Sequence, residues 1–95
     1  MRPVVYILTN SYNSVLYTGV TSDIDKRIRE HRGGVGAEFT RRYNLKKLVF
    51  VEYHSSMLEA IEREKQIKSW SRARKCDLIN RHNPLWHELM PFYDE

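Results

Sequence analysis

Two tyrosines, Tyr6 and Tyr17, flank a predicted turn in the first fifth of the chain. The stretch from Tyr6 to Gly19 holds two β-rich runs around the turn-forming residues 11–14, which predicts an antiparallel hairpin with one tyrosine in each arm. Side chains alternate along a strand, so Tyr6 and Tyr17 stand side by side if the register puts them on one face. Gly19 ends the second arm, where the backbone could approach a ligand closely. The alternative is that both tyrosines are ordinary strand aromatics.

A carboxylate on the apolar face of a predicted helix is the most informative single residue. Over 57–70 the helical period groups the apolar side chains on one face, and Glu64 falls in the middle of that face. A carboxylate there is costly unless it is paired or bound to a cation. Two interpretations stay open: an i,i+4 ion pair with Lys68, or a metal ligand that points beneath the hairpin. The face comprises Met57, Leu58, Ala60, Ile61 and Ile67.

An arginine and a histidine share one stripe of an earlier predicted helix. This helix follows the hairpin and ends at Gly33-Gly34, with Ile24 and Ile28 toward the core. Arg27 and His31 are one turn apart on the neighbouring stripe, which would look along the hairpin edge. Taken alone, Arg27 is a solubilising surface residue and His31 a helix-end charge.

The predicted elements follow the order strand, strand, helix, loop, strand, helix, helix, tail. The loop spans 33–47 and has room for one helical turn, and an apolar third strand spans 48–53. A last helix spans 72–82 and ends at Asn83-Pro84. We expect the tail, 83–95, to pack back on the domain through Leu85, Trp86, Leu89 and Phe92.

The positive charge is concentrated in two blocks. The net charge is +4, and residues 26–47 hold eight of the sixteen Lys and Arg, while 63–81 hold seven more. Such blocks on a small chain suggest a polyanion partner, although solvated helix faces explain most charge runs. In the 33–47 loop, glycines beside Thr40, Arg41 and Arg42 could contact phosphates, or form a flexible basic surface loop.

Several classes of protein are excluded or disfavoured by what the sequence contains. A length of 95 residues fits one domain that needs no disulfide staples. The single cysteine, Cys76, and the lack of a secretory signal predict a reducing, cytoplasmic location. The four histidines lack zinc-finger spacing, and neither a phosphate-binding glycine loop nor a nucleophile elbow occurs.

These motifs, in their order along the chain, resemble those of the GIY-YIG nuclease superfamily. The resemblance is strongest to its small stand-alone bacterial members, which are similar to the N-terminal nuclease domain of excinuclease C. The two signature tripeptides correspond to Val4-Val5-Tyr6 and Tyr17-Thr18-Gly19. Arg27, His31 and Glu64 follow at matching spacings. The first tripeptide lacks its Gly and Ile, and Val20 stands where excinuclease C carries a lysine. The resemblance covers nearly the whole chain, and residues 63–73 and 83–86 are similar to the stand-alone subgroup in particular.

The resemblance implies a fold and a chemistry. The fold is α+β, a small antiparallel three-stranded sheet flanked by helices in the order β-β-α-β-α-α, with residues 1–95 as a single nuclease domain. The chemistry is hydrolysis of phosphodiester bonds in DNA, with RNA not excluded, and structure-selective cleavage in DNA repair or recombination is expected. The chain would act as a monomer or weak homodimer, with a protein partner for targeting.

The resemblance also assigns roles to residues. Glu64 binds one Mg²⁺ or Mn²⁺, Arg27 clamps the phosphate, and Tyr6 is the general base or orients the water. A phenol needs cationic neighbours to lose its proton near neutral pH. Tyr17 and His31 hold or relay protons, and Asn83 is favoured over Asn80 as the late active-site amide. Contacts to the nucleic-acid backbone would come from Gly19, Thr40, Arg41, Arg42, Lys68, Arg72, Arg74 and Lys75.

Two other functions belong to different classes. One is a nucleic-acid-binding module that keeps the fold and cleaves nothing, against which the retained Glu64 and tyrosines argue. The other is a protein-interaction domain that uses the tail from Trp86 to Phe92.

Overall fold

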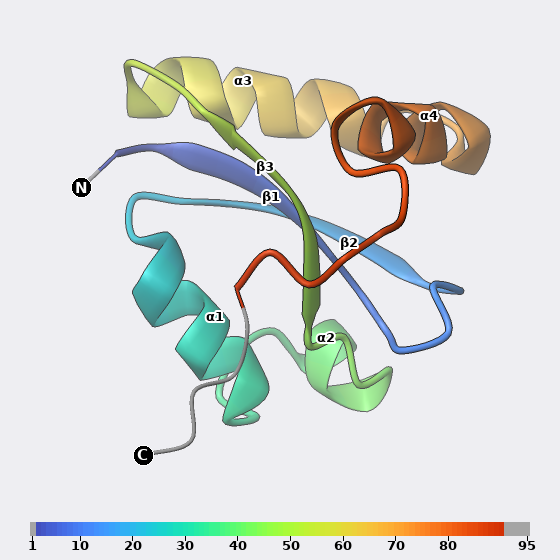
Figure 1. Ribbon diagram of the computed structural model, residues 1–95. Coiled ribbons are helices and arrows are strands. Elements are labelled where there is room, and N and C mark those ends of the chain that lie inside the picture. The colour runs from blue at the N-terminus through green and yellow to red at the C-terminus, as the bar shows by residue number, and fades with distance from the viewer. Residues whose placement is uncertain (1, 91–95) are drawn as a thin grey trace.

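A three-stranded antiparallel sheet with two helices on each side forms the centre of the computed structural model, which describes residues 2–90 (Figure 1). The strand order is β2-β1-β3, so the first strand is central. This confirms the α+β class, and the predicted order of elements holds except that the loop after the first helix contains a short additional helix, α2. The elements are β1 (Val4–Thr9), β2 (Leu16–Thr21), α1 (Ile24–Arg32), α2 (Glu38–Arg42), β3 (Lys47–Tyr53), α3 (Met57–Lys68) and α4 (Arg72–His82).

The hairpin between β1 and β2 forms because its turn is well satisfied. The backbone N–H of Asn13 donates to the carbonyl of Asn10 at 3.0 Å, and the N–H of Ser14 donates to the Asn10 side chain at 2.8 Å. Asn13 adopts a positive φ of 55°, a conformation that asparagine tolerates well. The turn fixes the register, with Tyr6 opposite Gly19 and Leu8 opposite Tyr17.

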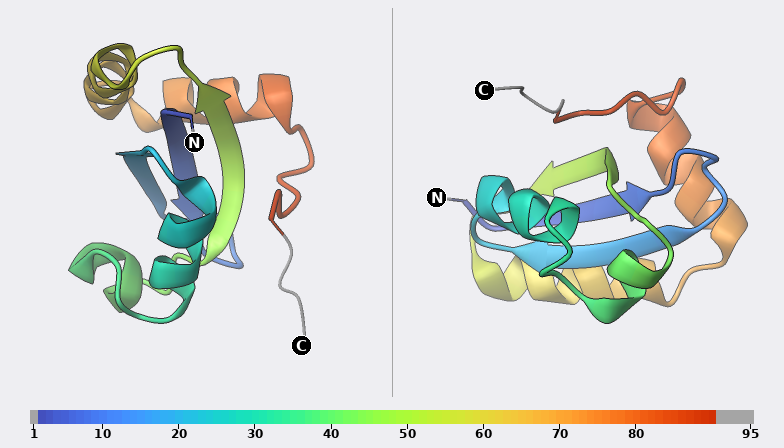
Figure 2. Two further views of the ribbon diagram at one scale, coloured as in Figure 1. Left: turned by 90° about the vertical axis from the view of Figure 1, so that its left-hand side faces the viewer. Right: turned by 90° about the horizontal axis from the view of Figure 1, so that it is seen from below.

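Alternate side chains of β1 point to opposite faces of the sheet and pack into two separate hydrophobic cores. Val5 and Ile7 pack with residues of α3 and α4, while Tyr6 and Leu8 pack with Ile28 of α1 on the other face. Figure 2 shows α1 and α2 on one side of the sheet and α3 and α4 on the other. Each such apolar side chain contributes about 1.5–3 kcal/mol when fully buried. The central strand is therefore held on both faces, and Tyr6 belongs to the face that α1 covers.

The predicted apolar face of α3 is only partly correct. Ala60 and Ile67 are fully buried, but Leu58 is 67% exposed. A helix that borders a small sheet buries a narrower stripe than its apolar residues span, so Leu58 falls outside the contact.

The described part of the tail lies along β3. The N–H of Leu89 donates to the carbonyl of Leu48 at 2.8 Å, and a carboxylate oxygen of Glu88 accepts from the Leu48 N–H at 2.9 Å. Trp86 packs against the core, which agrees with the prediction, whereas Leu85 is 74% exposed. The predicted contact of Phe92 lies outside the described residues.

Candidate active site

Tyr6 and Tyr17 lie on the same face of the hairpin, as predicted. Because Leu8 pairs with Tyr17, the two tyrosines are diagonal neighbours, and their ring centroids are 6.3 Å apart. Tyr6 is completely buried, while Tyr17 is partly exposed. The two neighbouring rings therefore extend from the buried core, at Tyr6, to the protein surface, at Tyr17.

Gly19 makes room for the Tyr6 phenol, and this corrects its predicted role. Gly19 sits directly opposite Tyr6 in the register, and a Cβ added there would overlap the Tyr6 ring and its hydroxyl. The space freed by the missing side chain is thus filled by the protein itself, so this face of Gly19 offers no room to a ligand.

His31 of α1 reaches across to the buried phenol. Its Nε2 lies 3.0 Å from the Tyr6 hydroxyl, and its ring is 5.7 Å from that of Tyr17. α1 is held in position by Asp23, whose side chain accepts from the N–H of Lys26 at 3.2 Å and so caps the first turn. The helix thereby delivers His31, which is 2% exposed, to the inner end of the tyrosine pair.

Thr40 sets the orientation and the tautomer of His31. The Thr40 hydroxyl donates to the carbonyl of Ala37 at 2.7 Å and lies 2.8 Å from Nδ1 of His31. A hydroxyl has a single proton. Because the Thr40 hydroxyl donates this proton to the hydrogen bond with the Ala37 carbonyl, its oxygen must accept the hydrogen bond from Nδ1–H of His31. Nε2 of His31 then carries a lone pair and accepts from the Tyr6 hydroxyl. A Cβ on Gly36 would overlap this imidazole, so a glycine is needed where the loop passes the ring.

This geometry corrects the prediction for Thr40. The residue is 1% exposed and both its hydrogen bonds are internal, so its hydroxyl does not face a phosphate backbone. The sequence carries no local signal for the contact, because Thr40 is nine residues beyond His31 in a segment of glycines.

The protonation of the two buried groups is set mainly by burial. Burial and the negative charge of a Tyr17 phenolate raise the pKa of Tyr6 to about 12, against the opposing effect of Arg27 through a hydrogen bond and its charge; Glu64 raises it further. Burial, together with the Arg27 charge, lowers the pKa of His31, while Glu30 raises it. Tyr6 is therefore a neutral phenol and His31 a neutral imidazole at pH 7. The one cationic neighbour that lowers the pKa of Tyr6, Arg27, does not outweigh burial in the protein alone.

Arg27 lies at the mouth of the site. It faces a hollow of about 260 Å³ that Tyr17 and His31 also line, and its Nε is 3.4 Å from a carboxylate oxygen of Glu30. Both partners of this ion pair are more than a third exposed, so it contributes little to stability and leaves the guanidinium available to an anion. The structure thus brings together Tyr6, Tyr17, Arg27 and His31.

Of the two open interpretations of Glu64, on α3, the structure shows the ion pair, and the metal-ligand interpretation stays a prediction. The Glu64 carboxylate lies 3.0 Å from the Lys68 ammonium, which is the predicted i,i+4 pair. Its charge also acts on the Tyr6 phenol. The Glu64 side chain is 13% exposed, whereas the Lys68 side chain is half exposed. Lys68 is accordingly occupied with Glu64, which differs from its predicted role at a phosphate.

Asn83 does not join the cluster. Its amide nitrogen donates to the carbonyls of Val49 and His87 at 3.0 and 2.9 Å, and its amide oxygen accepts from the N–H of His87 at 3.1 Å. These bonds fasten the tail to β3, so the residue is structural. The alternative, Asn80, accepts from the Trp86 indole at 2.6 Å.

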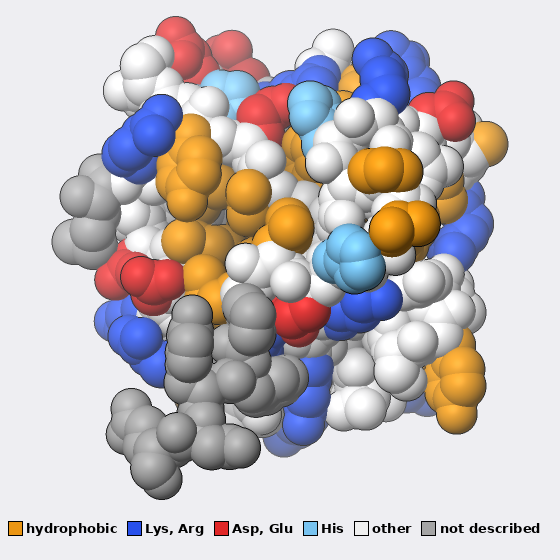
Figure 3. Space-filling view, in the orientation of Figure 1, with side chains coloured by type: hydrophobic (Ala, Val, Ile, Leu, Met, Phe, Trp, Pro, Cys, Tyr) orange, Lys and Arg blue, Asp and Glu red, His pale blue; other side chains and the backbone are white. Residues whose placement is uncertain are grey.

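The predicted basic contacts divide between two regions. Arg41 and Arg42 are exposed on α2, beside the candidate site. On α4, Arg72 donates to the carbonyl of Asn13 at 2.9 Å, Arg74 lies over the Trp70 ring at 4.1 Å, and Lys75 is half-buried. On the face shown in Figure 3, Lys and Arg side chains lie mostly at the rim around an apolar centre rather than in one patch.

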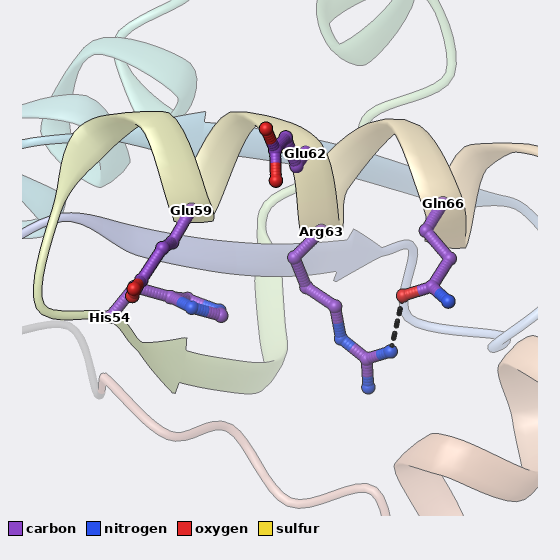
Figure 4. A pocket seen from close by; sticks show the side chains of 5 residues that line it. All are labelled: His54, Glu59, Glu62, Arg63 and Gln66. Atoms are coloured by element: carbon purple, nitrogen blue, oxygen red, sulfur yellow. Dashed lines mark hydrogen bonds between the residues drawn. The ribbon is translucent and has the colours of Figure 1, made fainter.

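A second hollow, of about 480 Å³, lies on the other side of the sheet, between α3 and the end of β3. Figure 4 shows the side chains that line it, in which Arg63 donates to Gln66 at 2.8 Å. Arg63 and His54 also bind the Glu52 carboxylate, at 2.9 and 2.8 Å. These groups satisfy one another, which favours a structural role. The lining residues are His54, Glu59, Glu62, Arg63 and Gln66.

Comparison with known proteins defines the class and then the family. The GIY-YIG catalytic domain matches residues 2–77, so the chain belongs to the GIY-YIG nuclease superfamily. A UPF0213 protein of Haloquadratum walsbyi is 43% identical over 78% of this chain and 82% of its own length, and one of Syntrophus aciditrophicus is 46% identical over 84% and 91%. The solution NMR structure of a UPF0213 protein from Bacillus halodurans superposes over the full length of both chains with a TM-score of 0.59 and 33% identity. The chain belongs to UPF0213, a family of stand-alone GIY-YIG proteins.

None of the helices in residues 2–90 is long and apolar enough to cross a membrane.

Proposed function

We propose that this chain is a metal-dependent endonuclease that hydrolyses phosphodiester bonds in DNA, selects structure rather than sequence, and acts in repair or recombination. The observation that carries the proposal is the hydrogen-bonded row Tyr6–His31–Thr40, which opens toward Arg27 and Glu64. A domain that only bound nucleic acid would need cations and exposed rings. It would have no use for a buried phenol bonded to a histidine of fixed tautomer.

The row supplies a path for a proton. The Tyr6 hydroxyl donates to Nε2 of His31, and its oxygen keeps a lone pair that could accept a hydrogen bond from an attacking water. Because Tyr6 is completely buried in the free protein, this step requires substrate binding to open the site to that water. As the water proton moves to the Tyr6 oxygen, the phenol proton moves to His31. Forming a free Tyr6 phenolate at pH 7 would cost about 7 kcal/mol, since five units separate that pH from a pKa of about 12. The relay avoids this cost, because the charge ends on His31.

Arg27 would bind the phosphate that is attacked. A guanidinium stays charged at any relevant pH and offers paired donors that match phosphate oxygens. The residue lines the hollow that opens at Tyr17 and His31, so a phosphate bound there lies over the proton path. Tyr17, at the wall of the same hollow, would hold the water or share the proton with Tyr6.

Glu64 would hold the divalent metal. Within residues 2–90 no group of three or more His, Cys, Asp or Glu side chains could hold an ion, so the proposed site relies on the Glu64 carboxylate. That donor set fits Mg²⁺ or Mn²⁺, which bind through one or two carboxylates and complete their shell with waters and substrate phosphates. When bound, the ion would neutralise charge on the phosphate and the leaving oxygen.

The test is cleavage of end-labelled duplex, single-stranded, flap and branched DNA by the wild type and by Glu64→Gln, with Mg²⁺ or Mn²⁺ and with chelator. We expect metal-dependent cutting by the wild type and none by the variant, with binding retained in both. The matched control is Glu62→Gln, an exposed carboxylate on the same helix. Equal background in all three proteins, with salt-sensitive binding, would favour the alternative function, a non-catalytic nucleic-acid-binding module that acts with a partner.

A further inference from the structure

Two half-exposed aromatic side chains continue the candidate site along α2. Phe39 and Tyr43 each leave 43% of their surface in solvent, and neither is part of the two buried clusters. The Phe39 ring stacks on Tyr17 with centroids 6.3 Å apart and planes at 28°, and the Tyr43 ring follows at 4.7 Å. These three rings form a row from the candidate site to solvent, here called the aromatic ledge (Tyr17, Phe39 and Tyr43).

Positive charge borders the aromatic ledge. Arg42 lies over the Tyr43 ring at 5.7 Å from its centroid, and together with Phe39 and Glu38 these residues line a hollow of about 290 Å³. Arg41, the neighbour of Arg42, is exposed. Exposed rings beside arginines are the combination that binds unpaired nucleotides, because bases stack on the rings and phosphates meet the cations.

We propose that the aromatic ledge binds an unpaired nucleobase next to the phosphate held at Arg27, so that the chain acts where bases are unstacked. This rests on the proposed function, since the ledge begins at Tyr17, which lines the same hollow as Arg27. In a duplex both faces of a base are covered by its neighbours, so only a frayed, looped or single-stranded nucleotide presents a free face to Phe39 or Tyr43. The ledge thereby selects structure without reading sequence.

The experiment compares two labelled strands of equal length and charge, an oligothymidine and an abasic strand, by fluorescence anisotropy in chelator. The wild type should bind the base-bearing strand about tenfold more tightly for a stacked base. Phe39→Leu and Tyr43→Leu should lose that preference and keep their affinity for the abasic strand. The control is Tyr53→Leu, because Tyr53 is 45% exposed and lies under an arginine, Arg2, at the far end of β3.

Equal affinity of the wild type for both strands would overturn the proposal, and so would leucine variants that keep the preference. A variant that also loses abasic binding has lost its fold and cannot test the aromatic ledge. In that case the test is fluorescence quenching of a 2-aminopurine base in a strand bound by the wild type. An absence of quenching would count against the aromatic ledge. Cleavage of the same strands with Mg²⁺ separates the two proposals. Equal cutting of both strands refutes the ledge and keeps the nuclease, whereas a base preference without any cutting refutes only the nuclease.

Discussion

Replacing Thr40 with valine should weaken the proton path without changing the shape of the site. Valine has nearly the same volume as threonine, but it removes the oxygen that lies 2.8 Å from Nδ1 of His31. His31 is 2% exposed, so no bulk water replaces that oxygen. The imidazole then has two options. It keeps a buried Nδ1–H that has no acceptor, or it carries the proton on Nε2, where two donors, Nε2–H and the Tyr6 hydroxyl, face each other.

The size of the effect follows from the buried hydrogen bond. Leaving a buried donor unsatisfied costs about 1–3 kcal/mol, which corresponds to about a 5- to 150-fold lower population of the productive tautomer. We expect kcat to fall by that factor with KM nearly unchanged, because Arg27 and the surface cations are untouched. Urea unfolding should show a stability loss of about the same size, since the Ala37 carbonyl also loses one of its two donors and keeps only the Arg41 N–H at 3.1 Å.

Two measurements check this reasoning. Nitrogen-15 NMR of the imidazole reports the tautomer directly in the free protein: Nδ1–H should dominate in the wild type and the variant should lose that dominance. Thr40→Ser keeps the hydroxyl and should restore both the tautomer and most of the rate. A valine variant with an unchanged His31 spectrum and unchanged kcat would refute the role of Thr40, as would a serine variant as impaired as the valine one.

Three further predictions concern neighbouring groups. Gly19→Ala should lower the free energy of unfolding by about 1–3 kcal/mol in urea and impair cleavage, because the added methyl group overlaps the Tyr6 phenol; a fully stable variant would contradict the packing. The acid limb of the pH–rate profile should have its midpoint below 6.5, since burial lowers the pKa of His31, and stability should fall as pH drops below 6.5 because the unfolded state takes up that proton first; a midpoint above 6.5 would exclude His31 as proton acceptor. Lys68→Met should tighten Mn²⁺ binding by at most about fivefold, followed by electron paramagnetic resonance, because the half-exposed pair with Glu64 is worth no more than about 1 kcal/mol; looser binding would show that the lysine supports the ion.

The parts of the site that depend on local periodicity could be predicted from the sequence. The hairpin turn fixes Tyr6 and Tyr17 on one face, and the helical repeat puts His31 one turn beyond Arg27. Both relations follow from chain geometry over a few residues, so no knowledge of distant contacts is needed. The apolar position of Glu64 likewise signalled a buried carboxylate in need of a partner.

The contacts that were missed all join residues through space. Because Thr40 follows several glycines, the sequence predicts that it faces phosphates. The chain instead folds back, and the Thr40 hydroxyl forms a hydrogen bond with His31. Gly19 is read as an opening for a ligand, whereas the opposing strand fills that space with Tyr6. Asn83, directly after the last helix, is predicted as the active-site amide, but its side chain makes three hydrogen bonds to backbone groups. In each case the sequence identifies a special residue, and only the tertiary packing decides what it meets.

Glu64 shows why two interpretations of one residue need not compete. The Lys68 ammonium, 3.0 Å away, gives the 13% exposed Glu64 carboxylate a partner of opposite charge in the protein alone. Because Lys68 is half exposed, the pair is weak and the lysine can return to water at small cost. A divalent ion that arrived with a phosphate would therefore have to compete only with this weak pair for the Glu64 carboxylate. In the proposed function, the ion pair with Lys68 would be the form that Glu64 takes in the absence of metal, so the structural and the chemical interpretation are compatible.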